Sequence, residues 1–281
     1  MAEDETNRRS ATANALAAGY GDFARLLAAS VPGARLYEDA DVAWVDTGLY
    51  DSAFNYVYDN ALPADERDRG VRRVTEHFRG RGLPFRWTVG LLGEPPGMAK
   101  VLEAHGLRLD EQEPGMMLES GAPPAAAVPG LEIRPVTDAE LLRRWIWTWG
   151  CGAPDDVIER WYGVYRALPY GPDGPLRMFV GFLDGEPVAT VYLHLAANQG
   201  TETLAGTVHY VVTRPEFRRR GIGAVMTQVA VRAAEAAGCR SVVLTASPYG
   251  VGVYRRLGFR EYCQADTYIW RPGTEPREVS A

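Results

Sequence analysis

The amino-acid sequence predicts an α/β protein of two tandem lobes, each with a mixed central sheet flanked by helices. One observation is a β-like run at 207–213 that leads through a glycine turn into an amphipathic helix ending near Ala237. The apolar residues of this helix recur three and four positions apart, which is the spacing of a buried helix face. A second observation is the alternation of apolar residues at 178–182, which is typical of a strand.

An echo between two distant segments is the third observation, and it predicts the two lobes. The segment 102–107 (LEAHGL) is similar to 254–259 (YRRLGF), and a strand follows each at the same offset. Such an echo indicates a duplication. Between the halves lies GAPPAAAVPG, whose prolines and small residues continue neither regular structure. We therefore predict domains at 1–120 and 131–281, joined by a linker at 121–130.

In the first half, hydrophobic periodicity predicts the helices and strands, and the polar residues 1–10 are expected to be disordered. The expected helices are 13–30, 64–79 and 98–104, and the expected strands are 41–60 (interrupted near Asp46), 85–92 and 114–119.

In the second half, Thr137 and Glu140 form a capping box ahead of a tryptophan-rich helix. Asp184-Gly185 is a strong signal for a two-residue hairpin turn. A further turn is expected at 198–200. The remaining expected strands are 132–136, 187–196, 203–213, 241–246, a stretch near 261 and 267–270, and the remaining helices are 154–165 and a short one around Tyr254.

Composition limits the classes of function. The 281 residues hold one large domain or two ordinary ones, and the net charge of −6 argues against nucleic acid as a partner. The three cysteines lack metal-ligand spacing, so no metal site is expected. The acidic, polar start is unlike a signal peptide, and no apolar run approaches the length of a membrane span. We expect a cytoplasmic monomer or homodimer without a membrane partner.

The stretch 218–223 has the properties of an anion site. Arg218, Arg219 and Arg220 precede Gly221-Ile222-Gly223 and a helix N-terminus, where unpaired N–H groups and the helix dipole favour a phosphate. The dinucleotide fingerprint is excluded because Met226 occupies the place of its third glycine. The P-loop is excluded because no Gly-Lys-Ser/Thr follows.

Two spaced motifs together resemble the GNAT superfamily of acyl-CoA N-acyltransferases. They are Arg-x-x-Gly-x-Gly at 218–223 and Tyr254 with Gly258-Phe259 about thirty residues on, with the strand 241–246 between them. The resemblance covers roughly 131–271. It implies acetyl-CoA as the cofactor and transfer of an acetyl group to the amine of a small molecule by direct attack in a ternary complex.

The resemblance also implies which residues bind the cofactor. Ser247 stands where the family commonly has an asparagine, and Gly250 stands where it has an alanine. The implied cofactor-binding residues are Val211, Val212, Thr213, Arg218, Arg219, Arg220, Gly221, Ile222, Gly223, Ala224 and Ser247.

Two residues are candidates for acid–base chemistry by the same resemblance. Tyr254 would lie near the sulfur and protonate the leaving thiolate, the alternative being a tyrosine that only packs under a short helix. His209 would take the ammonium proton, directly or through water, the alternative being a hydrogen-bonded strand histidine. His194 is a weaker candidate for the base.

The acceptor site is expected near the tryptophan-rich helices. Trp145, Trp147 and Trp149 cannot all face one core, so at least one should reach a cleft or the other lobe. We take Trp147 and Trp161 as substrate-binding candidates, which favours an apolar or aromatic amine. A purely structural role for any single tryptophan is the alternative.

In the first half, the segment 66–72 stands where the phosphate turn should be. Glu66 and Asp68 bring carboxylates, and Arg72 replaces the second glycine. Repulsion of phosphate and a bulky side chain predict that this lobe is degenerate and binds no cofactor. Two alternatives to small-molecule acetylation stay open: a non-catalytic acyl-CoA sensor, and acetylation of a protein amino group.

Overall fold

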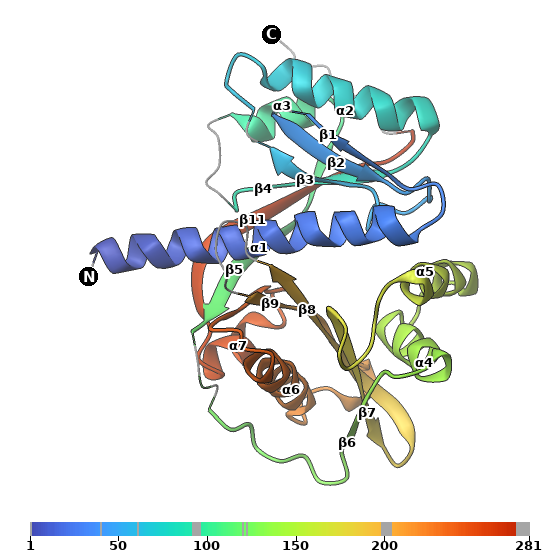
Figure 1. Cartoon of the computed structure of the whole chain (residues 1–281), viewed down its shortest axis with the longest axis vertical. Coiled ribbons are helices and arrows are strands. Elements are labelled where there is room, and N and C mark those ends of the chain that lie inside the picture. The colour runs from blue at the N-terminus through green and yellow to red at the C-terminus, as the bar shows by residue number, and fades with distance from the viewer. Residues whose placement is uncertain are drawn as a thin grey trace. The chain divides into compact units, whose positions relative to one another are not determined.

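The structure, a computed structural model, describes residues 2–39, 41–60, 62–91, 97–119, 121, 123–197 and 204–273. The chain forms two compact units. Unit 1 comprises Met1–Gly115 and Tyr262–Ala281, and unit 2 comprises Met116–Glu261. Each unit is an α/β sandwich with helices on both faces of a mixed sheet (Figure 1).

Unit 1 has the sheet order β1-β2-β3-β4-β11-β5, with β3 and β4 parallel. Helices α2 and α3 cover one face, and α1 lies on the other, where the Tyr20 carbonyl accepts a hydrogen bond from Tyr56. The elements are α1 (Ala2–Ser30), β1 (Arg35–Glu38), β2 (Val42–Asp46), β3 (Tyr56–Asn60), α2 (Arg67–Arg81), β4 (Phe85–Val89), α3 (Met98–Ala104), most of β5 (Arg108–Leu118) and most of β11 (Arg260–Trp270).

Unit 2 has the sheet order β5-β10-β9-β8-β7-β6, with β9 and β10 parallel. Helices α4 and α5 lie on one face and α6 and α7 on the other (Figure 1). The elements are the end of β5, β6 (Glu132–Pro135), α4 (Ala139–Trp149), α5 (Asp155–Ala167), β7 (Leu176–Leu183), β8 (Glu186–Ala197), β9 (Leu204–Thr213), the 3₁₀ turn η1 (Pro215–Phe217), α6 (Ile222–Ala236), β10 (Val242–Thr245), α7 (Val251–Arg256) and the start of β11.

The compact units divide the chain differently from the predicted domains. Residues 266–270 of β11 pair with β4 of unit 1, from Asp266↔Val89 to Trp270↔Phe85. The end of β5 instead contributes Met116 to the apolar core of unit 2. The physical reason is burial of apolar surface. Trp270, at the end of β11, is buried in the core of unit 1, so the last strand of the second half belongs to the sheet of the first.

The segment predicted as a linker is held against α6 rather than free. It has no regular structure, as predicted, but Gln228 accepts a hydrogen bond from the Ala125 amide (3.2 Å) and donates one to the Pro123 carbonyl (2.9 Å). Val128 packs against the core of unit 2. The described part of 121–130 is therefore an ordered segment that packs against α6.

The predicted repeat is visible as two matching strand–helix–strand units. Both α2 and α6 have 15 residues and join two parallel strands. Arg67 Nε donates to the Leu62 carbonyl (3.4 Å), and Arg218 Nε donates to the Thr213 carbonyl (3.0 Å), at the same place in each unit. The short helices α3 and α7 both end before a glycine with positive φ, Gly106 or Gly258.

Some predictions from local sequence signals agree with the structure and others do not. Asp184 and Gly185 both have positive φ (50° and 80°), which confirms the hairpin turn. Helix α1 begins at Ala2, so the prediction of disorder at 1–10 is wrong for the described residues. Asp138, not Thr137, caps α4, because its carboxylate accepts a hydrogen bond from the Leu141 amide (2.9 Å). The predicted turn at 198–200 lies outside the described residues.

None of the described helices is long and apolar enough to span a membrane.

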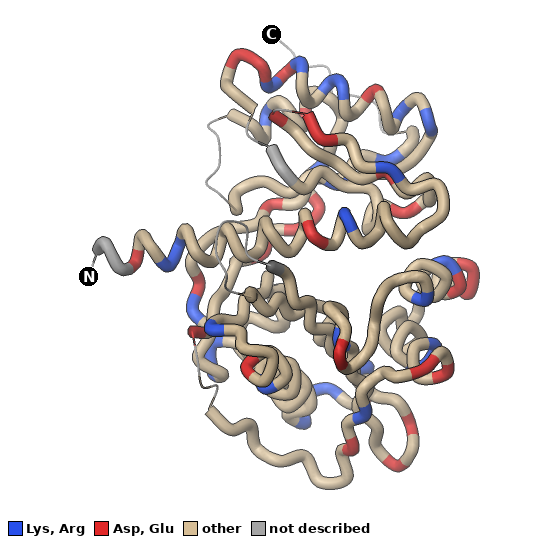
Figure 2. The backbone as a smooth tube through the Cα atoms, viewed as in Figure 1, with Lys and Arg blue, Asp and Glu red and all other residues tan. Residues whose placement is uncertain are grey.

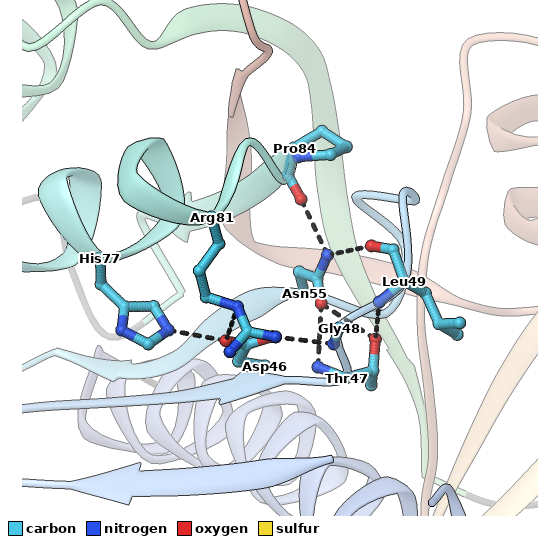
Figure 3. A network of polar contacts seen from close by, with 8 residues as sticks. All are labelled: Asp46, Thr47, Gly48, Leu49, Asn55, His77, Arg81 and Pro84. Atoms are coloured by element: carbon cyan, nitrogen blue, oxygen red, sulfur yellow. Dashed lines mark hydrogen bonds and ion pairs between the residues drawn. The ribbon is translucent and has the colours of Figure 1, made fainter. Parts of the chain in front are cut away.

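A buried polar network fixes the loop between β2 and β3 in unit 1 (Figure 3). The Asn55 amide donates to the carbonyls of Leu49 (2.7 Å) and Pro84 (3.0 Å), and its oxygen accepts from Thr47. The buried carboxylate of Asp46 accepts from His77 Nε2 (2.7 Å) and pairs with Arg81 (3.0 Å). The buried side chains of Asp46, Thr47 and Asn55 thus all have hydrogen-bond partners, which stabilises the loop.

We expect Asn55→Ala to destabilise the protein by roughly 2–4 kcal/mol, because it leaves buried backbone groups of Leu49, Pro84 and Thr47 without partners. Denaturant unfolding followed by circular dichroism measures this. The control Glu76→Gln, on the exposed face of α2, should change stability by less than about 0.5 kcal/mol. An Asn55→Ala protein as stable as the wild type would contradict the assigned network.

Candidate functional site

The site is built where two parallel strands of unit 2 separate. Strands β9 and β10 pair only at Val242↔Gly206 and Val243↔Thr207. Beyond these residues β9 runs on to Thr213 and stays paired with β8. Within the described parts of the two strands, the edge of β9 that faces β10 is therefore open from Val208 onward, and its backbone groups are available to a ligand.

A bulge in β9 lies at this point of separation. The register with β8 shifts between Thr190↔Val212 and Tyr192↔His209, so two residues of β9 oppose one of β8. Tyr210 takes a positive φ of 50°, which is uncommon for a residue other than glycine. Its carbonyl is held by the Thr190 hydroxyl (2.9 Å). The bulge bends β9 and leaves backbone groups of the extra residue unpaired in the ladder.

The glycine turn follows β9 and opens helix α6. Gly221 is the N-cap with φ 82°, and Arg219 also has a positive φ of 63°. Gly223 has ordinary backbone angles, and a Cβ there would lie 3.8 Å from the nearest atom, Thr213 Oγ1. The N-terminus of α6 is thus uncovered on this side, and its first N–H groups can bind an anion.

A cavity of about 890 Å³ lies between the end of β9, the glycine turn and α7. Of the residues predicted to bind the cofactor, all but Arg220 line it. The predicted residues that line it are Val211, Val212, Thr213, Arg218, Arg219, Gly221, Ile222, Gly223, Ala224 and Ser247. Arg220 instead donates to the Glu216 carbonyl (3.4 Å), with its guanidinium over Phe217.

The charge of the cavity is positive although the whole chain is acidic. Arg218, Arg219 and Arg256 line it, and no acidic residue does. Within the described residues no carboxylate forms an ion pair with these three arginines. By contrast, Arg214 just outside pairs with Glu186 and Glu216 and is therefore neutralised. The cavity is suited to a ligand with several negative charges.

Tyr254 lines the cavity from α7 and is almost fully buried. Its ring packs against Phe259, with centroids 5.9 Å apart. One turn earlier, a Cβ on Gly250 would lie 2.7 Å from the ring and 3.4 Å from the hydroxyl. The glycine that stands in place of the family's alanine therefore leaves the space that the tyrosine ring occupies.

His209 is half-buried on β9 and does not line the cavity. Its ring stacks on Tyr192, with centroids 5.4 Å apart, two residues before the cavity-lining Val211. The other candidate, His194, is buried on β8. The structure thus brings Tyr254 to the cavity and leaves His209 beside it, within an aromatic cluster.

The two predicted acceptor tryptophans lie in different surroundings. Trp147 is 48% exposed, with the Arg214 guanidinium 5.1 Å above its ring. Trp161 belongs to a half-buried cluster with Trp149 (4.3 Å between centroids), which in turn contacts Tyr210 at the bulge (4.4 Å). Trp149 therefore joins this cluster to β9, as the buried Trp145 also does through Tyr210 (6.0 Å), and neither was selected as a substrate-binding candidate.

The sequence of the second half matches one protein-family model. A model of the Acetyltransferase (GNAT) family matches residues 139–259. Residues 139–259 therefore match a GNAT acetyltransferase domain. A search of curated proteins found no match to this sequence.

Solved structures share the fold of this acetyltransferase over most of its length. A GCN5-related N-acetyltransferase from Kribbella flavida has a TM-score of 0.67 at 21% identity and covers 92% of this chain and 96% of its own. One from Sphaerobacter thermophilus has a TM-score of 0.57 at 19% identity, covering 93% and 94%. A tandem GNAT protein from the clavulanic acid biosynthesis pathway has 0.58 at 15%, covering 91% and 95%. The prediction of an α/β fold with tandem GNAT-like lobes is confirmed.

In unit 1 of the acetyltransferase, the place of the glycine turn is filled. The Leu62 side chain lies over Gly70, where a Cβ would come within 2.5 Å of it. Asp68 accepts a hydrogen bond from His105 Nε2 (2.9 Å) and pairs with Arg72. The hydrogen bond from His105 and the charge of Arg72 lower the pKa of this carboxyl. Leu102 stands where unit 2 has Tyr254.

Several cavity residues of the acetyltransferase were missed by the sequence analysis. They come from the 3₁₀ turn and from the segment between β10 and the end of α7, and they are Pro215, Phe217, Tyr249, Gly250, Val253 and Arg256. The Ser-Pro-Tyr-Gly turn at 247–250 was a usable signal, because a turn residue next to proline and glycine is exposed.

We expect Gly223→Asp to weaken binding of acetyl-CoA by roughly 100-fold or more, because it places a carboxylate at the anion site. The fold should survive, since the new side chain meets only open space near Thr213. Calorimetry measures the affinity and circular dichroism the fold. The neutral isostere Gly223→Asn should lose less affinity. Unchanged binding in folded Gly223→Asp would refute the site.

Proposed function

We propose that this protein is an acetyl-CoA-dependent N-acetyltransferase that transfers an acetyl group to the amine of a small molecule by direct attack in a ternary complex. The observation that carries the proposal is the cavity with three arginines and no acid, at the opening between β9 and β10 and beside Tyr254. Neither a neutral nor a cationic cofactor would need such a lining.

The residues of the cavity fit coenzyme A. The N-terminus of α6 with Arg218 and Arg219 would hold the pyrophosphate, because N–H groups and guanidinium groups are its best donors. The open edge of β9 at 211–213 would hydrogen-bond the pantetheine arm, and Ser247 would contact it from the other side. Acetyl-CoA, when bound, supplies the acetyl group as a thioester. An N–H of β9 directed at the thioester oxygen would stabilise developing negative charge.

Proton transfer is proposed for two side chains. The Tyr254 hydroxyl would protonate the departing thiolate, a role supported by its place in the cavity wall. His209 would accept the ammonium proton, through water, since the side chain lies beside the cavity and not in its wall. Gly250 supports the first role by leaving room for the Tyr254 ring.

The acceptor is proposed to bind at the aromatic cluster next to β9. Trp149, Trp161 and Tyr210 are half-buried and present flat apolar surface beside the cavity-lining Val211. Carboxylates on α4 and α5 alternate with arginines (Figure 2) and pair with them, for example Glu140 with Arg144 and Asp156 with Arg160. An apolar or aromatic amine held by cation–π contact is therefore favoured over a polycation.

The experiment that tests the function is thiol release from acetyl-CoA across a panel of amines. The panel should include arylalkyl amines, aliphatic amines, aminoglycosides and peptides with a free amino group. Turnover with small aromatic or apolar amines supports the proposal. Binding of acetyl-CoA without turnover on any amine would favour a sensor, and turnover on peptides alone would favour a protein substrate.

We expect Tyr254→Phe to lower kcat by about 10²–10⁴-fold, because general acid catalysis contributes this much. The affinity for acetyl-CoA should not change, since phenylalanine keeps the ring packing against Phe259. Steady-state kinetics and calorimetry measure the two quantities. The control Tyr37→Phe, whose ring stacks on Trp44 in unit 1, should keep wild-type turnover. Wild-type kcat in Tyr254→Phe would exclude its role as the acid.

The first lobe is proposed to be degenerate, so that one chain binds one acetyl-CoA. Leu62 over Gly70 supports this because it fills the place of the turn. Asp68 supports it because it pairs with Arg72 and so occupies a cation that a phosphate would need. Calorimetry on the full chain should give a stoichiometry of one, and Gly223→Asp should give none. Two cofactors per chain would refute the degenerate lobe.

A further inference from the structure

Thr190, on β8, is fully buried and does not line the cavity. We propose that its hydroxyl is a positioning group for acetyl transfer: it fixes the peptide between Tyr210 and Val211 so that the Val211 N–H points at the thioester oxygen of acetyl-CoA. The inference rests on the proposed function. It assigns the β9 donor of that reaction to Val211 and names the side chain on the neighbouring strand that orients this donor.

Side chains hold the backbone at the bulge. The two bulged residues of β9, Tyr210 and Val211, have no partner residue on β8. The Thr190 hydroxyl donates to the Tyr210 carbonyl (2.9 Å). On β8 itself, the indole N–H of the buried Trp145 donates to the carbonyl of Val191, the residue opposite the bulge (3.1 Å). The orientation of the bulged peptide therefore depends on the Thr190 side chain, because no paired residue of β8 fixes it.

The shape of the peptide unit decides where the Val211 N–H points. In a planar trans peptide the C=O and the N–H point in opposite directions, and none of the described peptides is cis. The Tyr210 carbonyl is held by Thr190, so the Val211 N–H points away from Thr190. Val211 lines the cavity, on the edge of β9 where β10 no longer pairs. The Val211 N–H is thus a donor at the open edge.

The ladder between β8 and β9 gives the same direction. In an antiparallel pair every second residue bonds to the neighbouring strand, and the residues between them face away from it. The Arg214 amide donates to the Val188 carbonyl (2.9 Å), so Arg214 faces β8, and Val212 faces it too. Thr213 accordingly faces away, and its carbonyl accepts from an arginine of the cavity wall (3.0 Å). Val211, two residues before Thr213, also faces away from β8.

A donor fixed at this edge stabilises the charge of the reaction. Negative charge develops on the thioester oxygen as the amine attacks, and an N–H that is already oriented toward this oxygen needs no reorganisation. The phosphates of the cofactor are proposed to bind elsewhere, at the glycine turn with Arg218 and Arg219. Loss of the Thr190 hydroxyl should therefore lower kcat and leave the affinity for acetyl-CoA unchanged.

The test compares Thr190→Val, which replaces the hydroxyl by a methyl group of similar size, with Thr190→Ser, which keeps the hydroxyl. Thr190→Val should lower kcat by about 10–100-fold, less than the roughly 10²–10³-fold cost of removing an oxyanion donor altogether. Its affinity for acetyl-CoA, measured by calorimetry, should equal that of wild type. Thr190→Ser should have a kcat close to wild type, and circular dichroism checks that each variant folds.

A second measurement does not depend on turnover. Infrared difference spectroscopy gives the C=O stretching frequency of bound acetyl-CoA that is isotope-labelled at its carbonyl carbon. A hydrogen bond from the Val211 N–H weakens this C=O bond, so the frequency should lie below that of the free ligand in wild type and in Thr190→Ser. It should move back toward the free value in Thr190→Val. Thr190→Cys, whose thiol is a weak donor, should lie between them, and it replaces Thr190→Val if that variant does not fold.

Thr207→Val is the matched control. Thr207 is another buried threonine of the same sheet, and within the described residues its hydroxyl has no hydrogen-bond partner. This variant should match wild type in kcat, affinity and stretching frequency.

Three results would contradict these assignments, each at a different level. Wild-type kcat and frequency in folded Thr190→Val or Thr190→Cys, or a loss in Thr190→Ser equal to that in Thr190→Val, would overturn the role of the Thr190 hydroxyl. Wild type that binds acetyl-CoA without a lowered frequency would overturn the role of Val211. Failure of wild type to bind acetyl-CoA at all would overturn the proposed function itself, and is distinct from the other two.

Discussion

The separation of β9 from β10 is the constraint on which the site depends. Two parallel strands would normally satisfy each other's backbone groups along their whole length, but here the pairing ends at Thr207 and Val243. The bulge at Tyr210 bends β9, and the Thr190 hydroxyl donates a hydrogen bond to the Tyr210 carbonyl, so this bulged carbonyl keeps a partner. The cavity, its backbone donors and the uncovered N-terminus of α6 all follow from this opening.

Charge is distributed so that the opening stays positive in an acidic protein. Two arginines near the cavity but outside its wall are paired with carboxylates: Arg214 with Glu186 and Glu216, and Arg255 with Glu261. Arg218 lies in the cavity wall, where its Nε donates to the Thr213 carbonyl and none of the described carboxylates forms an ion pair with it. Uncompensated guanidinium groups in a concave site raise the local concentration of a polyanionic ligand.

The sequence predicts turns that are encoded by neighbouring residues. It does not predict which distant strands and helices come into contact. The hairpin at Asp184-Gly185 and the glycine turn were predictable, because each is encoded by residues a few positions apart. The partner of β11 was not, since nothing within 262–270 says which sheet will bury Trp270. For the same reason the bulge at Tyr210 and the contact of Trp149 with it were missed: both arise from strands and helices that meet only after folding.

The two units differ at one position of their short helices, which lines the cavity in unit 2 and packs in the core in unit 1. In unit 2, Gly250 leaves space for the Tyr254 ring at the cavity; an alanine Cβ would lie 2.7 Å from that ring and would push it away. In unit 1, Leu102 stands at the equivalent place and is buried among apolar side chains. The two short helices nevertheless end alike, because the amides of Leu107 and Phe259 bond back to residues 102 and 254 at 3.0 Å. The backbone of the short helix is thus the same in both units, whether its side chain is Tyr254 or Leu102. A duplication in which one lobe has lost the tyrosine would leave this pattern.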